Sequence, residues 1–266
     1  TGLRAAEYTL ANDQVVVTCE SKAGRFLPGS LQDKKSGQTV KLGAELFSLL
    51  LTNGDFIHGS DFTLAGSVQT EPLAANPAAS RFAERLPGKQ LTAELASADG
   101  NIHLTWHGIL RDGSRYLRQE FIFKAEQQEV PLSGILLFNT PLVGAHPTGT
   151  VDGSPVATDT VFFGIEHPLS INRGEMGHVR CFLPRGASLN AGESYACSLV
   201  VGFVAPGQLR RGFLAYLERE RARPYQPFLH YNSWYDLGYF NKYNEAGALD
   251  RINAFGQELV VKRGVK

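Results

Sequence analysis

Residues 102–124 read IHLTWHGILRDGSRYLRQEFIFK, and apolar side chains alternate with polar ones on both sides of a central turn. A period of two residues is typical of a β-strand with one buried face. Asp112-Gly113 lies between the two alternating runs, and this dipeptide favours the tight turn of a hairpin. The sequence therefore predicts an antiparallel hairpin with its turn across residues 111–114.

Short strand-like runs separated by turn residues extend on both sides of this hairpin, from Leu3 to about Pro206. The clearest of these runs are residues 14–19, 38–42, 45–51, 134–139, 160–164, 179–183 and 194–204. Roughly ten or more strands over about 200 residues exceed an immunoglobulin-type sandwich. We expect residues 1–206 to form a larger, mainly antiparallel β-sandwich with at most a few short helical turns.

One segment of this region, residues 70–88, is rich in Ala, Pro and small residues and has no clear period. We interpret it as a long surface loop between strands. Such a loop is either a solvated connection or a lid, and connections are the commoner case.

After Pro206 the period changes from two residues to that of a helix. Residues 208–223 place Leu209, Phe213, Tyr216 and Leu217 on one side, with arginines and glutamates on the other. Pro224 ends this pattern, so residues 207–227 are predicted to hold a linker helix between two domains.

The next stretch, residues 227–236, reads PFLHYNSWYD. An apolar and aromatic run of this length predicts one buried strand that ends in polar and aromatic groups. Asn244 is a suitable N-cap for a following amphipathic helix that extends to Lys262. Residues 228–266 are therefore predicted to form one βα unit.

Asn232-Ser233-Trp234, at the end of the predicted strand, resembles the clan of α-galactosidases and α-N-acetylgalactosaminidases, and glycoside hydrolase family 36 most closely. Residues 162–168, FFGIEHP, are also similar to a segment of the N-terminal domains of such enzymes. The resemblance implies a mainly β fold: a galactose-mutarotase-like β-supersandwich (1–206), a linker helix (207–227) and the start of a (β/α)8 barrel (228–266). Where many relatives have Gly-Trp before Asn-Ser-Trp, this chain has His230-Tyr231.

This resemblance implies an exo-acting α-glycoside hydrolase whose substrate is an α-galactoside or an α-N-acetylgalactosaminide. At the end of a barrel strand, Asn232, Trp234 and Asp236 are candidate substrate-binding residues. An indole can stack on the apolar face of a sugar, while an amide and a carboxylate bind its hydroxyls. The alternative is that the aromatic residues pack the domain junction and Asp236 caps a turn.

The catalytic residues are not identified within this sequence. A retaining glycosidase needs two carboxyl groups about 5–5.5 Å apart, and the family's Asp-Asp-Gly-Trp and its catalytic aspartates would lie beyond Lys266. Glu166-His167 is interpreted as a structural turn rather than an acid–base pair. An alternative function is therefore a non-catalytic carbohydrate-binding or structural module, for which a stop codon after Lys266 would be the sign.

A second polar group, Asp55, His58 and Asp61, lies in a glycine-flanked loop. A solvated turn is the favoured interpretation, ahead of a loop that reaches the sugar pocket and of a metal site.

The chain has 26 basic and 26 acidic residues, and its basic residues are dispersed. This balance argues against nucleic-acid binding and suits a neutral partner such as a sugar. No apolar stretch approaches the roughly 20 residues of a membrane span. Nucleotide, metalloprotease and serine-hydrolase motifs are also absent from the sequence, so we expect no cofactor.

Cys19, Cys181 and Cys197 have no metal-binding spacing, so we expect no metal site. Buried free thiols are favoured over a disulfide between Cys181 and Cys197. The sequence has no initiator methionine or signal peptide, and Thr1 is expected to be the start of a trimmed chain. A periplasmic or extracellular location follows only from the resemblance, and a homo-oligomer is left open.

Overall fold

The computed structural model describes residues 5–228, 230–238, 242 and 244–265. The chain divides into two compact units, Thr1–Pro224 and Tyr225–Lys266, which are described separately below.

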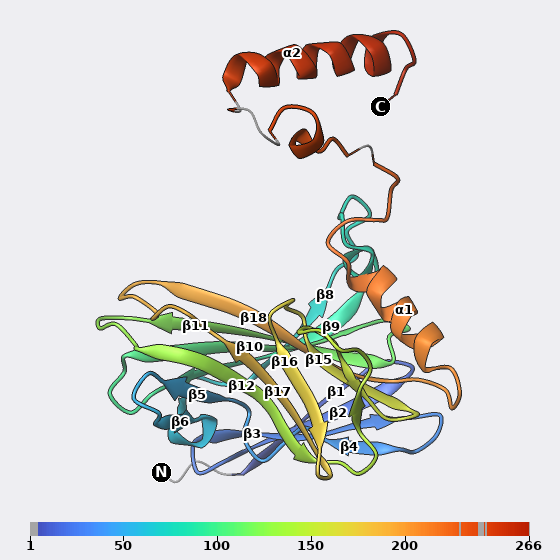
Figure 1. Cartoon of the computed structure of the whole chain (residues 1–266). Coiled ribbons are helices and arrows are strands. Elements are labelled where there is room, and N and C mark those ends of the chain that lie inside the picture. Colours follow the sequence, from blue (N-terminus) through green and yellow to red (C-terminus); the bar gives the residue numbers. More distant parts are fainter. Residues whose placement is uncertain (1–4, 229, 239–241, 243, 266) are drawn as a thin grey trace. The chain divides into compact units, whose positions relative to one another are not determined.

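The first unit is built almost entirely from antiparallel strands (Figure 1). Its strands are β1 (Ala6–Ala11), β2 (Val15–Lys22), β3 (Arg25–Asp33), β4 (Thr39–Lys41), β5 (Ser48–Leu51), β6 (Phe56–His58), β7 (Thr63–Leu64), β8 (Gln69–Leu73), β9 (Gly88–Ala96), β10 (Ile102–Arg111), β11 (Tyr116–Ala125), β12 (Leu132–Pro141), β13 (His146–Pro147), β14 (Val156–Ala157), β15 (Val161–Ile165), β16 (Ile171–Glu175), β17 (His178–Pro184) and β18 (Ser194–Phe203). Its helical segments are the 3₁₀ turns η1 (Gly59–Asp61) and η2 (Phe82–Arg85) and helix α1 (Leu209–Glu220).

These strands form three sheets. A nine-stranded sheet has the order β13-β14-β15-β18-β11-β10-β9-β7, with β8 also paired to β9. A five-stranded sheet (β16-β17-β12-β5-β6) and a four-stranded sheet (β1-β2-β3-β4) complete the unit. The predicted hairpin is confirmed, since β10 and β11 are antiparallel neighbours.

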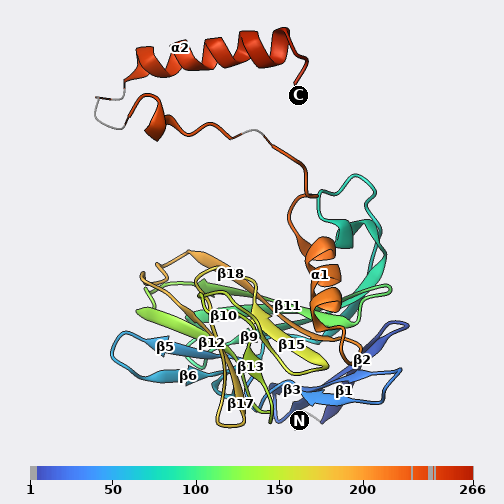
Figure 2. The ribbon, with the colours of Figure 1, turned by 45° about the vertical axis from the view of Figure 1, so that its right-hand side comes forward.

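The apolar core lies between the nine-stranded sheet and the two smaller sheets (Figure 2). Three aromatic pairs cross between the layers, with ring centroids 5.0–5.2 Å apart: Phe26–Trp106, Phe47–Phe123 and Phe138–Phe163. These layers of antiparallel strands around one core confirm the predicted β-sandwich. Because successive strand residues point to opposite faces, the same strands also present a second, outer face.

Helix α1 packs on the outer face of the nine-stranded sheet. A small apolar cluster lies beneath it, formed by Tyr116, Ala157, Phe162, Val200, Val204 and Tyr216, with Leu209 and Phe213 packed against it. The helix predicted at residues 208–223 is confirmed with slightly narrower bounds. Leu217 does not share the buried side, because its side chain is 41% exposed.

The expectation that residues 70–88 form one long loop is wrong. Residues Gln69–Leu73 form strand β8, which pairs with β9, and Phe82–Arg85 form the turn η2. Pro72 lies in β8, which is compatible with an edge strand because proline has no amide proton to donate.

The second unit contains the 3₁₀ turn η3 (Ser233–Tyr235), helix α2 (Glu245–Phe255) and its π-helical continuation η4 (Gly256–Val261). The predicted N-cap is confirmed, since Asn244 Oδ1 accepts a hydrogen bond of 2.8 Å from the Gly247 amide. Leu249, Ile252 and Phe255 of α2 are exposed within this unit. Among the helices described, none is long and apolar enough to cross a membrane.

The strand predicted within residues 228–236 is wrong for the described part of this segment; Leu229 lies outside the described residues. Phe228 and His230 to Asp236 contain no strand, and the turn η3 takes its place. A barrel strand depends on hydrogen bonds from neighbouring strands, and no strand described in the structure pairs with this segment. The start of a barrel thus stays a prediction.

Candidate functional site

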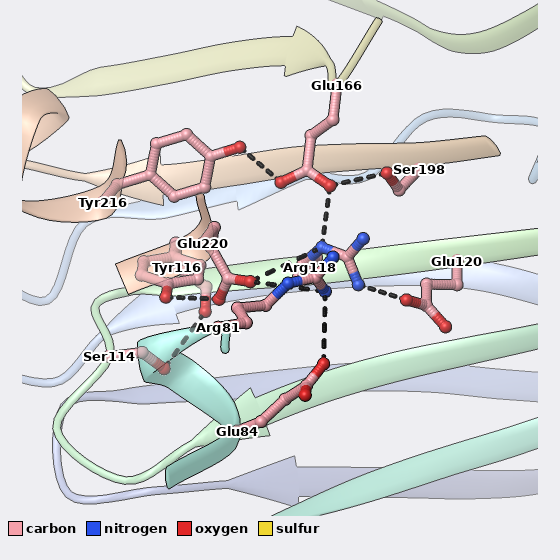
Figure 3. Close-up of polar contacts among 10 residues, drawn as sticks. All are labelled: Arg81, Glu84, Ser114, Tyr116, Arg118, Glu120, Glu166, Ser198, Tyr216 and Glu220. Carbon is pink, nitrogen blue, oxygen red and sulfur yellow. Dashed lines mark hydrogen bonds and ion pairs between the residues drawn. The ribbon is translucent and has the colours of Figure 1, made fainter. Parts of the chain in front are cut away.

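A cluster of charged and tyrosine side chains lies on the outer face of the nine-stranded sheet, next to α1 (Figure 3). Its centre is Arg118 of β11, whose side chain is 9% exposed. Arg118 Nε lies 2.7 Å from Oε2 of Glu166 and 3.7 Å from Oε2 of Glu220. The same guanidinium forms an ion pair with Glu120. One buried cation thus serves three carboxylates from three segments of the chain.

Glu166 follows strand β15 and is held by three donors. Besides Arg118, it accepts hydrogen bonds from Ser198 Oγ of β18, at 2.5 Å, and from the Tyr216 hydroxyl of α1. Burial, followed by the charge of Glu166, raises the pKa of Tyr216. This tyrosine therefore stays protonated and donates its hydrogen bond across the helix–sheet contact.

Glu220, in the last turn of α1, is held in a similar way. It accepts a hydrogen bond of 2.6 Å from the Tyr116 hydroxyl of β11, and Arg81 Nη1 lies 3.9 Å from its other oxygen. Burial raises the pKa of Glu220, which the Tyr116 hydrogen bond and the charge of Arg118 oppose. The carboxylate of Glu220 thus anchors the end of α1 to the sheet.

A pocket of about 420 Å³ opens beside this cluster. Its walls include Arg118, Glu166, Glu220, Tyr216 and the ring of Phe213. Both carboxylates already accept hydrogen bonds from tyrosines and lie within ion-pair distance of arginine. A general acid or base needs a proton-exchange path to substrate, whereas these contacts hold α1 in place on the sheet. The arrangement is suited to positioning and to binding polar groups.

The grouping of Arg118, Tyr116, Tyr216 and Glu220 was not predicted from the sequence. Two signals could have pointed to them: Arg118 interrupts an apolar strand, and Tyr216 and Glu220 are spaced to share one face of a helix. Glu166 was interpreted as structural, and its saturated hydrogen bonding agrees with that. His167 also has a turn role, since its Nδ1 accepts the Leu169 amide at 3.1 Å.

The candidate sugar-binding residues lie in the second unit. Asn232 Oδ1 accepts a hydrogen bond of 3.0 Å from the Trp234 amide, so Asn232 caps the turn η3. The indole of Trp234 is 54% exposed. Asp236 accepts hydrogen bonds from Tyr231, at 2.6 Å, and from Arg251 Nε, at 2.7 Å.

These contacts lower the pKa of Asp236, through the Tyr231 hydrogen bond first and Arg251 next. Asp236 is therefore an ionised acceptor at neutral pH. The structure brings Asn232 and Trp234 together through one turn and ties Asp236 to α2.

The other polar candidates have local partners. Asp61 Oδ2 accepts the His58 amide at 2.8 Å, and His58 Nδ1 lies 2.8 Å from Ser48 Oγ. Asp55 accepts a hydrogen bond of 2.7 Å from Asn53. Across the described residues, no group of three or more His, Cys, Asp or Glu side chains could hold a metal ion.

All three cysteines are free thiols. Cys181 lies on β17 of the five-stranded sheet and Cys197 on β18 of the nine-stranded sheet, and the disulfide considered above is not formed. Burial raises the pKa of Cys197 to about 12, so this thiol is protonated at neutral pH.

No protein-family model matches the sequence, and a search of curated proteins found no match. Solved structures do match its fold. The chain is similar to a family 36 α-galactosidase of Geobacillus stearothermophilus in complex with 1-deoxygalactonojirimycin, with a TM-score of 0.53 and 10% identity over 95% of this chain. The same enzyme in complex with stachyose gives a TM-score of 0.54 and 10% identity over 82% of this chain. An α-galactosidase from Lactobacillus brevis gives a TM-score of 0.50 and 11% identity over 94% of this chain.

These matches define the class of fold: a mainly β chain with the architecture of the N-terminal β-sandwich region of family 36 α-galactosidases. The mainly β, sandwich fold implied by the resemblance is thus confirmed, while the start of a barrel stays a prediction. The chain spans about half the length of the solved structures that it matches, covering 48%, 44% and 47% of them.

Proposed function

We propose that this chain is the N-terminal portion of an exo-acting α-glycoside hydrolase of the α-galactosidase or α-N-acetylgalactosaminidase type. The observation that carries the proposal is the fold match over 95% of the chain to an α-galactosidase in complex with 1-deoxygalactonojirimycin. In this proposal the catalytic carboxylates belong to residues after Lys266. Catalytic carboxylates outside these residues fit the observation that Glu166 and Glu220 are already engaged by tyrosine and arginine partners.

The second unit would contribute binding groups to the sugar pocket. The exposed indole of Trp234 offers a flat apolar surface for the face of a sugar ring. Asp236 is ionised and oriented by Tyr231 and Arg251, so it can accept a hydrogen bond from a sugar hydroxyl. Asn232 would orient Trp234 through the turn, and its amide nitrogen could bind a further hydroxyl.

The proposed partners are a galactose- or N-acetylgalactosamine-type α-glycoside and the remainder of a catalytic barrel. The apolar side chains of Leu249, Ile252 and Phe255 would pack against that barrel, since exposed apolar faces of this kind are commonly covered by protein. A homo-oligomer and a periplasmic or extracellular location are part of the same proposal.

The test is to read the gene beyond codon 266 and to assay its complete product on aryl α-galactoside and aryl α-N-acetylgalactosaminide. We expect Asp-Asp-Gly-Trp, further βα units and hydrolysis of one of the two substrates. A complete product that binds galactosides without hydrolysing them would replace the enzyme by a carbohydrate-binding module. A product that neither binds nor hydrolyses them would contradict the proposal.

A further inference from the structure

A second pocket, of about 330 Å³, runs along the side of α1 away from the Arg118 cluster, from the N-cap residue Gln208 to Arg219 in the last turn. Its charged lining residues are Arg115, Arg211 and Arg219, and no aspartate or glutamate lines it. Its volume is in the range of small-molecule sites, which is about 300–1,000 Å³. The pocket is therefore large enough for a small metabolite and carries one sign of charge.

The three arginines are not neutralised equally. Arg115 is paired with the buried carboxylate of Asp33, at 2.9 Å. Arg219 donates to the Asp112 carbonyl oxygen, at 2.7 Å, and its Nε is buried without a hydrogen-bond partner. A buried donor without an acceptor destabilises the fold. Arg219 is thus largely engaged by the hairpin turn, whereas Arg211 is exposed and is the guanidinium most available to a ligand.

The start of α1 adds to this field. Gln208, the N-cap residue, lines the pocket, and its side chain makes no capping hydrogen bond. The first amides of a helix lack partners within the helix and carry a partial positive charge. The first turn contains no acidic residue but does contain Arg210 and Arg211, which the helix dipole disfavours at this end. An oxyanion in the pocket would offset each of these costs.

The uncharged lining defines the rest of the ligand. Side chains of Phe162, Phe203, Val204 and Ala215 form an apolar wall, while Ser114 and Gln208 are polar. Such a wall suits the carbon skeleton of a small molecule whose anionic group lies at the arginines.

We propose that this pocket binds a small organic anion, a phosphate or carboxylate group carried on a body the size of a monosaccharide. Arg211 and the first amides of α1 bind the oxyanion, and the apolar wall contacts the body. Arginine forks and helix N-termini both match the geometry of oxyanions. The proposal does not depend on glycosidase activity, because every residue involved belongs to the first unit.

The test is an NMR titration of the ¹⁵N-labelled 266-residue chain with D-galactose 1-phosphate, D-galacturonate and neutral D-galactose. We expect saturable shifts at the amides of residues 208–211 with one or both anions and none with galactose. Binding of only the phosphate or only the carboxylate would identify the anionic group. Higher salt should weaken the binding.

Variants make the test specific. Arg211→Gln should weaken anion binding about tenfold or more, because a charge-assisted contact is lost. Arg210→Gln is the matched control, because Arg210 is adjacent on the helix but does not line this pocket. Arg210→Gln should change affinity by less than about twofold. Absence of saturable shifts with both anions, equal binding of galactose, or equal effects of the two variants would overturn the proposal.

Discussion

Arg118 Nε and Glu166 Oε2 lie 2.7 Å apart, and this ion pair links strand β11 to the residue that follows strand β15. Strand β18 separates β11 from β15 in the sheet, so the contact spans it. Glu166 also accepts a hydrogen bond from Tyr216, so the same ion pair reaches helix α1. The last element of the first unit is thus attached to the sheet by charge as well as by its apolar face.

Replacement of Arg118 tests this attachment. Arg118→Met leaves three carboxylates around the site without their shared cation, and removing one partner of a buried ion pair costs about 3–5 kcal/mol. We expect a decrease of that size in the free energy of unfolding measured in urea. Lys124→Met is the control, since Lys124 is on the same strand but its pair with Glu126 is exposed. Equal losses for the two variants would contradict a central role for Arg118.

The raised pKa of Glu220 predicts a pH dependence of stability. A group whose pKa is higher in the folded state stabilises the fold below its unfolded pKa, and this contribution is lost as the pH rises through the folded value. Glu220→Gln removes the titration, so the variant should gain stability relative to wild type as the pH rises from about 4 to about 7. Urea unfolding of both proteins at several pH values measures this difference. A difference that is constant with pH would show that Glu220 has no raised pKa.

Asp33 should show the opposite behaviour. Burial acts to raise its pKa, but hydrogen bonds from Ser36 and the guanidinium of Arg115 outweigh burial and lower it. A lowered pKa gives stability that is present above the unfolded pKa and is lost as the pH falls through the folded value. Asp33→Asn should therefore cost about 1–3 kcal/mol at neutral pH and less in acid.

Ser36→Ala provides a smaller change of the same kind, because it removes the hydroxyl donor at 2.6 Å but leaves the Ser36 amide and Arg115 in place. Ser36→Ala should also lose stability at neutral pH, by less than Asp33→Asn does. If Asp33→Asn lost as much stability in acid as at neutral pH, the carboxylate charge would not be the cause.

Features of this chain that depend on neighbouring residues were predicted from the sequence, and features that depend on distant contacts were not. The hairpin of residues 102–124 was predicted because alternation and an Asp-Gly turn are local properties. The N-cap at Asn244 is local as well, and it is confirmed. Strand β8 was missed because its pairing with β9, rather than any pattern in residues 69–73, determines it.

The Arg118 cluster depends on how α1 lies on the sheet. Tyr216 and Glu220 meet Arg118 and Glu166 across sequence separations that no local pattern encodes. The strand predicted at residues 228–236 fails for a related reason: an apolar run indicates burial but does not supply the partner strands that a parallel sheet requires.

Gly202 on β18 lies against the two aromatic side chains that contact Tyr216 of α1. A Cβ atom at Gly202 would lie 2.3 Å from Cζ of Phe162 and 2.7 Å from Cβ of Tyr116, and both rings contact Tyr216 of α1. Gly202→Ala should therefore displace these rings, cost about 1–3 kcal/mol, and speed hydrogen exchange in α1. Gly66→Ala is the control, since a Cβ there meets no atom within 4 Å. Unchanged exchange in α1 would show that Phe162 does not hold the helix.

Trp234 provides the test of the proposed sugar site in the complete gene product. Its indole is 54% exposed, so truncation should leave the stability of the fold nearly unchanged. If the indole stacks on the sugar, Trp234→Ala should lower kcat/KM on an aryl α-glycoside by about 1–3 kcal/mol, or roughly 5- to 150-fold. Tyr235→Ala is a matched control, because Tyr235 lies in the same turn and is exposed, and it should change kcat/KM by less than about twofold. Equal kinetics for wild type and Trp234→Ala, in folded protein, would exclude Trp234 from the sugar pocket.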